Sequence, residues 1–242
     1  MSKAVKKQEN SVVINDDLGL DAWGASPVSA QDIVIPKILC MQGLSELVTE
    51  DQAKMGDFVD SLTKQVIGSA SKPIEFIPFH LEKIWIISEK KVGESDFSFK
   101  EIVPVTPANE GMRYQEVVDG AELKREYTRN FYVLRPDDMG LPYIISFKGM
   151  SAKAGKQLAT QMYVKNAAEG KNPAAKVMKL GGFKEKNAKG TYYVLSTTEA
   201  RDSEIDEQRQ ALQWYKTVNA GKTQAHEEHP VHKAEGFEET RF

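Results

Sequence analysis

The sequence has a single cysteine, no long apolar run and none of the short motifs that mark common enzyme classes. One cysteine cannot form an internal disulfide or a cysteine-based zinc or iron–sulfur site. No run approaches the roughly 18 to 20 apolar residues that a membrane-spanning helix needs, and the N-terminus lacks the apolar core of a secretory signal. We therefore expect a soluble chain in a reducing, cytoplasmic setting.

Signatures of catalysis are missing as well. The chain has no P-loop, no GxGxxG after a predicted strand, no HExxH and no GxSxG. Cys40 lies in the apolar stretch ILCMQG, where a buried thiol is favoured over a nucleophile. His226, His229 and His232 share a face only on a helix, which Pro230 disfavours. We expect a protein that is not an enzyme and uses no cofactor or metal.

Charge of either sign is plentiful but unevenly distributed. The formal net charge is −3, yet residues 143–193 carry ten lysines against two acidic residues, and every flanking segment is acidic. Such asymmetry favours a surface for an anionic partner. The alternative is a solvated exterior whose lysines pair with acidic residues from elsewhere in the fold.

The apolar patterns predict a mainly β fold with two helices, in the α+β class. Strands are expected within 72–91 and 96–107, and as a hairpin over 125–149, with Pro78 at an edge or a bulge. A helix capped by Ser151 covers about 152–169, and strands at 176–183 and 191–197 flank a turn over 184–190. This order is that of an OB-type five-stranded barrel with an inserted helix.

The chain divides into four parts on the same patterns. Residues 1–30 form a flexible N-terminal arm, and 31–200 form the OB-type nucleic-acid-binding domain. An additional C-terminal helix occupies 201–221, with its core at 203–218 behind the acidic DSEIDE, and 222–242 form a flexible acidic tail. The segment 32–47 is apolar but interrupted by Pro36 and Gly43, and no role is assigned to residues 31–70.

Aromatic residues interleave the lysines of 143–193, among them Tyr163, Phe183 and Tyr193. Lysines can contact the backbone phosphates, and aromatic rings can stack on unpaired bases. The combination favours binding of single-stranded nucleic acid. On 125–135, strand alternation places Tyr127, Arg129, Phe131 and Val133 on one face. For each single ring, burial in the core is the competing interpretation. The predicted DNA-binding residues are Tyr127, Arg129, Phe131, Lys148, Lys153, Lys156, Lys165, Lys179, Lys184, Lys186, Lys189 and Tyr192.

Three segments together resemble bacteriophage single-stranded DNA-binding proteins with an OB fold. They are LPYIISFKGMSAKAGKQLATQMYVKN (141–166), the lysine hairpin ending in GTYYVL (190–195), and the tail EGFEETRF. The resemblance implies a protein of the host cytoplasm that coats exposed strands during DNA replication, recombination or repair. It also implies that Glu238, Glu239 and Phe242 recruit replication or recombination enzymes, although Arg241 departs from a purely acidic tail.

Two other functions remain open at this stage. One is an adaptor protein of a phage that acts through its acidic termini and has no DNA affinity. The other is a mediator that anneals complementary strands during recombination. The sequence also leaves open whether the chain forms a homo-oligomer.

Overall fold

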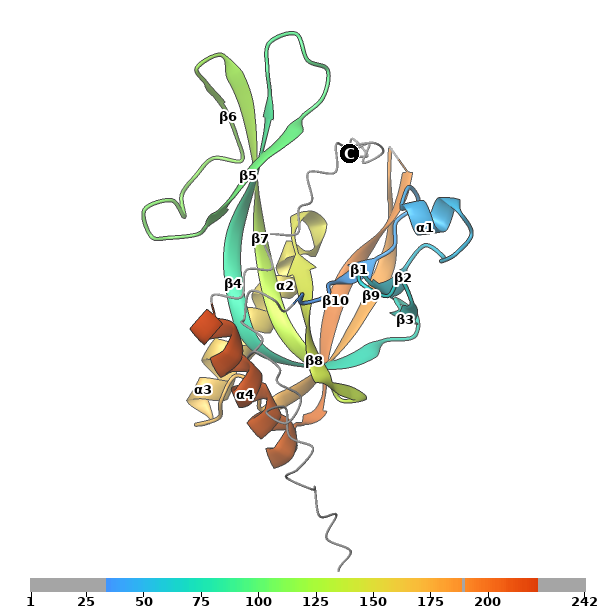
Figure 1. Cartoon of the computed structure of the whole chain (residues 1–242), viewed down its shortest axis with the longest axis vertical. Helices are drawn as coiled ribbons and strands as arrows, with labels where there is room; N and C mark the ends of the chain where they lie inside the picture. The colour runs from blue at the N-terminus through green and yellow to red at the C-terminus, as the bar shows by residue number, and fades with distance from the viewer. Residues whose placement is uncertain (1–33, 189, 222–242) are drawn as a thin grey trace, which may run out of the picture.

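The computed structural model describes residues 34–188 and 190–221, and the predicted N-terminal arm and tail lie outside these ranges. Strands dominate, and the helical parts are one short helix, one longer helical stretch and one C-terminal helix (Figure 1). In chain order the elements are β1 (Ile38–Cys40), α1 (Glu46–Thr49), β2 (Asp57–Asp60), β3 (Val66–Ser69), β4 (Ile74–Lys90), β5 (Ser98–Pro104), β6 (Gln115–Val118), β7 (Ala121–Arg135), β8 (Asp138–Phe147), η4 (Gly149–Ser151), α2 (Ala152–Thr160), η5 (Gln161–Lys165), α3 (Asn166–Ala168), β9 (Lys176–Asn187), β10 (Gly190–Asp202) and α4 (Ile205–Gly221).

The larger sheet is built around β4, and its strand order is β10-β9-β4-β7-β6, with β5 beside β4 and β8 beside β7. All of these pairings are antiparallel. The start of β4 pairs with β9, and the rest pairs with β7 from Ile77 onward. The register shifts between Pro78 and His80, as expected where a proline cannot donate to the ladder. The sheet curls into a half-barrel (Figure 1).

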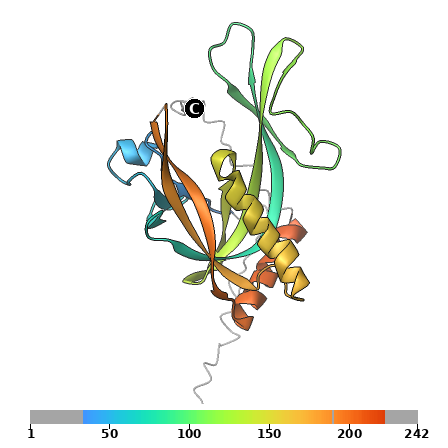
Figure 2. The same ribbon diagram turned by 180° about the vertical axis from the view of Figure 1, so that it is seen from behind.

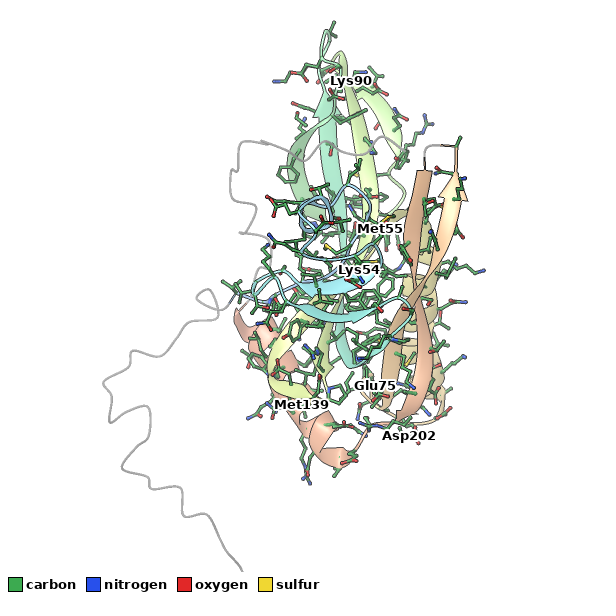
Figure 3. The ribbon with its side chains drawn as sticks, turned by 90° about the vertical axis from the view of Figure 1, so that its right-hand side faces the viewer. Lys54, Met55, Glu75, Lys90, Met139 and Asp202 are labelled. Carbon is green, nitrogen blue, oxygen red and sulfur yellow. The ribbon has the colours of Figure 1, made fainter. Side chains whose placement is uncertain are left out.

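A small sheet of order β1-β2-β3 lies between the two edges of the half-barrel. At one edge, Lys37 forms a parallel bridge with Ile144 of β8. At the other, the side chain of Gln42 hydrogen-bonds the backbone of Tyr193 on β10. Figure 3 shows this sheet, with Lys54 and Met55 labelled, in front of the half-barrel. The segment that sequence patterns left without a role therefore helps to close the fold.

Two apolar cores occupy the two faces of the curled sheet. The inner core includes Phe58 of the small sheet, Phe76, Phe131 and Phe147 of the large one, and Leu158 of α2. The outer core is formed where Ala211 and Val218 of α4 cover Ile77, Tyr132 and Ile144. Both faces of the sheet are therefore buried around Phe76 and Ile77 of β4 and around Phe131 and Tyr132 of β7.

The expected α+β class and both expected helices are confirmed, although some local details differ. Helical structure runs from Ala152 to Ala168, and the last helix covers Ile205–Gly221. Ser151 stands at the N-cap without a side-chain capping bond, because its hydroxyl accepts from the N–H of Leu195 at 3.0 Å. Among the described residues, no helix is both long and apolar enough to cross a membrane.

The main error in the expected strands concerns their lengths. The predicted turn over 184–190 is largely strand, since β9 continues to Asn187 and β10 begins at Gly190. Continuous cross-strand pairing, such as Tyr192 opposite Glu185, extends the ladder into a polar, lysine-rich segment. Likewise, residues 108–125, which lie between the expected strands, contain β6 and the start of β7.

Candidate nucleic-acid interface

Residues 143–193, the lysine-rich stretch noted above, are called the basic segment. Four of its lysines are paired with carboxylates from distant parts of the chain. Lys148 lies 2.9 Å from Glu126, and Lys179 lies 3.8 Å from Glu75. Asp202 is 2.6 Å from Lys176 and 3.9 Å from Lys171. The hydrogen bond from Lys176 lowers the pKa of Asp202, so this carboxylate stays ionised. For these four lysines, the fold supplies the acidic neighbours that the interpretation of a solvated exterior requires.

The other lysines of the basic segment form two groups. Within residues 34–188 and 190–221, no ion pair is found for Lys153, Lys156 and Lys165 on the α2–η5 helix, or for Lys184 and Lys186 near the tip of the β9–β10 hairpin. Lys189, also at that tip, lies outside the described residues. These six lysines thus separate into a helix group and a hairpin group.

The helix group is positioned by the amphipathic pattern of α2 and η5. Ala154, Leu158 and Met162 point into the inner core, which leaves the lysines at the surface. Gly155 allows a close approach of the helix to the sheet, since a Cβ at this position would lie 2.6 Å from the Cβ of Phe147. The lysines are therefore carried by an element that is firmly packed against β8.

A polar hollow of about 600 Å³ lies beside this helix, toward β10. Lys153, Lys156 and Lys165 line it, and its one carboxylate, Glu199, is held 2.7 Å from Lys176. The amides and hydroxyls around these lysines add donors that suit phosphate or sugar oxygens. The remaining lining residues are Gln157, Leu158, Thr160, Gln161, Met178 and Thr197.

Three polar residues that line the hollow, Gln157, Thr160 and Gln161, are not among the residues predicted from the sequence. Each of them lies four positions from one of the lysines: Gln157 from Lys153, Thr160 from Lys156 and Gln161 from Lys165. Helical spacing could therefore have placed them beside the lysines. Thr197 comes from β10, and no local pattern connects it to the helix.

The predicted residues of β7 have different environments. Phe131 does not fit its predicted role, because it is fully buried and cannot stack on a base. Its ring packs edge-on against Phe147, with 5.5 Å between the ring centroids. Arg129 lies over the ring of Tyr127 at 4.6 Å, and Tyr127 packs edge-on against Trp85. Arg129 and Tyr127 therefore remain candidates, with their side chains ordered against each other.

Tyr192 is held on the β9–β10 hairpin by its hydroxyl, which donates to Glu185 at 2.8 Å. This hydrogen bond raises the pKa of Tyr192, so the phenol remains neutral. Its ring is half-buried. Glu185 reduces the positive charge on this face of the hairpin, whereas Lys184 and Lys186 alternate onto the other face.

Candidate groups for catalysis or metal binding are sparse. Among the described residues, no three His, Cys, Asp or Glu side chains gather as a metal site. Burial, with the nearby charge of Asp57, raises the pKa of Cys40 to about 12, so this thiol is protonated at neutral pH. The histidines at 226, 229 and 232 and the tail residues Glu238, Glu239 and Phe242 lie outside the described residues.

The chain matches the model of a family described as Pam3 phage gp34-like protein, and the match covers residues 6–224. It belongs to the Pam3 phage gp34-like family. The match includes the small sheet, the large sheet and α4, so the gp34-like region contains the whole described fold. The family description supports the expected phage origin. No curated protein and no solved structure matches this chain.

Proposed function

We propose that this gp34-like protein binds single-stranded DNA in the phage-infected cell and acts without catalysis during replication, recombination or repair. The observation that carries the proposal is the group of lysines on α2–η5, which line a polar hollow and have no ion pair within the described ranges. Cations without carboxylate partners retain their full charge for phosphates.

The order of elements supports an OB-type barrel for this function. Strands β4, β7 and β8 precede the helical segment, and β9 and β10 follow it, as in a five-stranded OB barrel with its helix before the last two strands. The tip of the β9–β10 hairpin and the segment between β4 and β7, which carries β5 and β6, project from the same end of the half-barrel (Figure 1). In OB barrels, the corresponding two loops grip oligonucleotides.

The test is a fluorescence anisotropy titration of labelled oligo-dT at several salt concentrations. We expect affinity that falls with salt, with a log–log slope of about −0.7 for each phosphate neutralised, and weaker binding to duplex. Replacing Lys153, Lys156 and Lys165 by glutamine should flatten the slope by about 2.

A matched control carries glutamine at Lys171, Lys176 and Lys179, which removes the same formal charge from lysines that already have partners. This control should keep most of the affinity and the slope, with circular dichroism to confirm folding. Absence of oligo-dT binding by the wild type at low salt would rule out the proposed function. Equal losses in both variants would show that only net charge matters.

A further inference from the structure

A second and larger concavity, a groove of about 960 Å³, lies between the α2–η5 helix and α4. Residues of both helices line it, and Figure 2 shows the α2–η5 helix in front of the sheet with α4 behind it. The groove forms because β4 pairs with β9 only as far as Phe76 and gains β5 only at Ile84. On the edge of β4 opposite β7, helices rather than a strand therefore flank residues 77–83. Lys156 and Thr160 line both the groove and the hollow, so the two concavities adjoin.

Large apolar and aromatic side chains are exposed in this groove. Tyr163 is 44% exposed and Tyr215 is 41% exposed, and they come from opposite walls. The ring of Tyr215 packs edge-on against His80, with 5.6 Å between the ring centroids, and Tyr163 lines the groove together with Leu81 of β4. The ring of Tyr215 is therefore held in place before any ligand arrives. Val164, Ile205 and Leu212 complete the exposed apolar surface.

The charges that line the groove are all positive. Its lining includes Lys83, Arg129, Lys156 and Arg209, and no aspartate or glutamate. Glu110 lies 4.0 Å from Lys83 and Asp206 lies 2.7 Å from Arg209, but neither carboxylate lines the groove. An anion with flat apolar parts matches this surface better than an apolar peptide or a lipid tail does.

We propose that the groove binds unpaired bases of the single strand, with the bases stacked on Tyr163 and Tyr215 and the backbone phosphates near Arg129, Lys156 and Lys83. This inference rests on the proposed function and adds a site for the bases to the lysines that hold phosphates. Bases in a duplex stack on each other and cannot present their faces to these rings. The groove therefore favours single strands over duplex.

The test compares oligo-dT with an abasic oligonucleotide of the same length, by anisotropy, on the full chain. Replacing both Tyr163 and Tyr215 by alanine should weaken oligo-dT binding by about tenfold or more, given the usual contribution of base stacking, and leave abasic binding unchanged. The double phenylalanine variant keeps the ring faces and should stay within about twofold of the wild type. Leu62→Ala, which truncates an exposed apolar side chain outside both the groove and the hollow, is the control and should bind like the wild type.

Crosslinking of an oligonucleotide that contains 5-iodouridine gives an independent readout, which should map to Tyr163 or Tyr215. If the wild type binds oligo-dT but the double alanine variant binds equally well, the groove assignment is wrong while the proposed function stands. Crosslinks confined to the hollow would also contradict the groove assignment, and a protein partner would then be the alternative ligand of the groove. If the wild type does not bind oligo-dT at all, both proposals fail together.

Discussion

The side-chain amide of Gln42 pairs with both backbone groups of Tyr193, 151 residues away along the chain. The N–H of Tyr193 donates to Oε1 at 2.9 Å, and Nε2 donates to the carbonyl at 3.2 Å. A strand edge normally needs a neighbouring strand to satisfy such groups. Here one side chain does this for a residue of β10, and it joins the small sheet to that strand.

Replacing Gln42 by alanine should therefore lower the free energy of unfolding by about 1–3 kcal/mol, because two half-buried backbone groups lose their partners. Urea denaturation of the purified variant measures the change. Gln52→Ala serves as the control, since that amide is exposed and bonds only Glu50 nearby. A Gln42 variant as stable as the control would show that water replaces the amide without cost.

Gly56 makes the second contact between the small sheet and β10. Its φ is +86°, and a Cβ there would lie 2.7 Å from the ring of Tyr193. Gly56→Ala should thus destabilise the fold by more than the roughly 1–2 kcal/mol expected for the backbone conformation alone. Gly93→Ala measures the cost of the backbone conformation alone, because Gly93 has a φ of +91° and no atom lies within 4 Å of the added carbon. Equal melting temperatures for the two variants would contradict the close packing.

The hairpin lysines offer a test that separates binding from folding. Changing Lys184, Lys186 and Lys189 to glutamate should weaken oligo-dT binding, because three cations become anions on the proposed DNA-binding tip. The melting temperature should change little, since Lys184 and Lys186 are exposed. Anisotropy and thermal melts on the same preparation provide both values. Unchanged affinity would place the DNA path away from this hairpin.

His80 predicts a pH dependence of stability. Burial lowers its pKa in the folded chain, and the nearby charge of Glu82 opposes this only in part. As the pH falls below the ordinary histidine value of about 6.5, the unfolded chain takes up the proton more readily than the folded one. The free energy of unfolding should therefore decrease from pH 7 toward pH 5.

Urea titrations at several pH values measure this loss, and His80→Gln should show a smaller loss than the wild type. The three tail histidines are present in both proteins, so the difference isolates His80. A variant with the same pH profile as the wild type would place the origin of the effect elsewhere.

Local patterns predicted the faces of β7 correctly but not their environments. Phe131 and Val133 share the inner core, whereas Tyr132 and Leu134 share the outer one, as alternation requires. Both faces are buried because α4 covers the outer one. Phe131 lies on the inner face, which α2 and the small sheet cover. A pattern within 125–135 carries no information about these elements, so the burial of Phe131 could not be deduced from it.

The charge count likewise located the basic surface without showing which lysines are available. The partners of Lys148 and Lys179 are Glu126 and Glu75, which come from strands far away in the sequence. The groove was missed for the same reason. Its two tyrosines lie on helices that are far apart in the sequence, and Lys83, which also lines it, lies on β4.

The position of the small sheet also determines when this fold can be completed. Residues 34–69 leave the ribosome early, yet Gln42 and Gly56 contact Tyr193, and Phe58 shares a core with Leu195. The N-terminal sheet therefore has no finished surface to join until translation has passed β10. Until then, the apolar residues of β1 and β2 are only partly covered on the nascent chain, which leaves this segment prone to aggregation during synthesis.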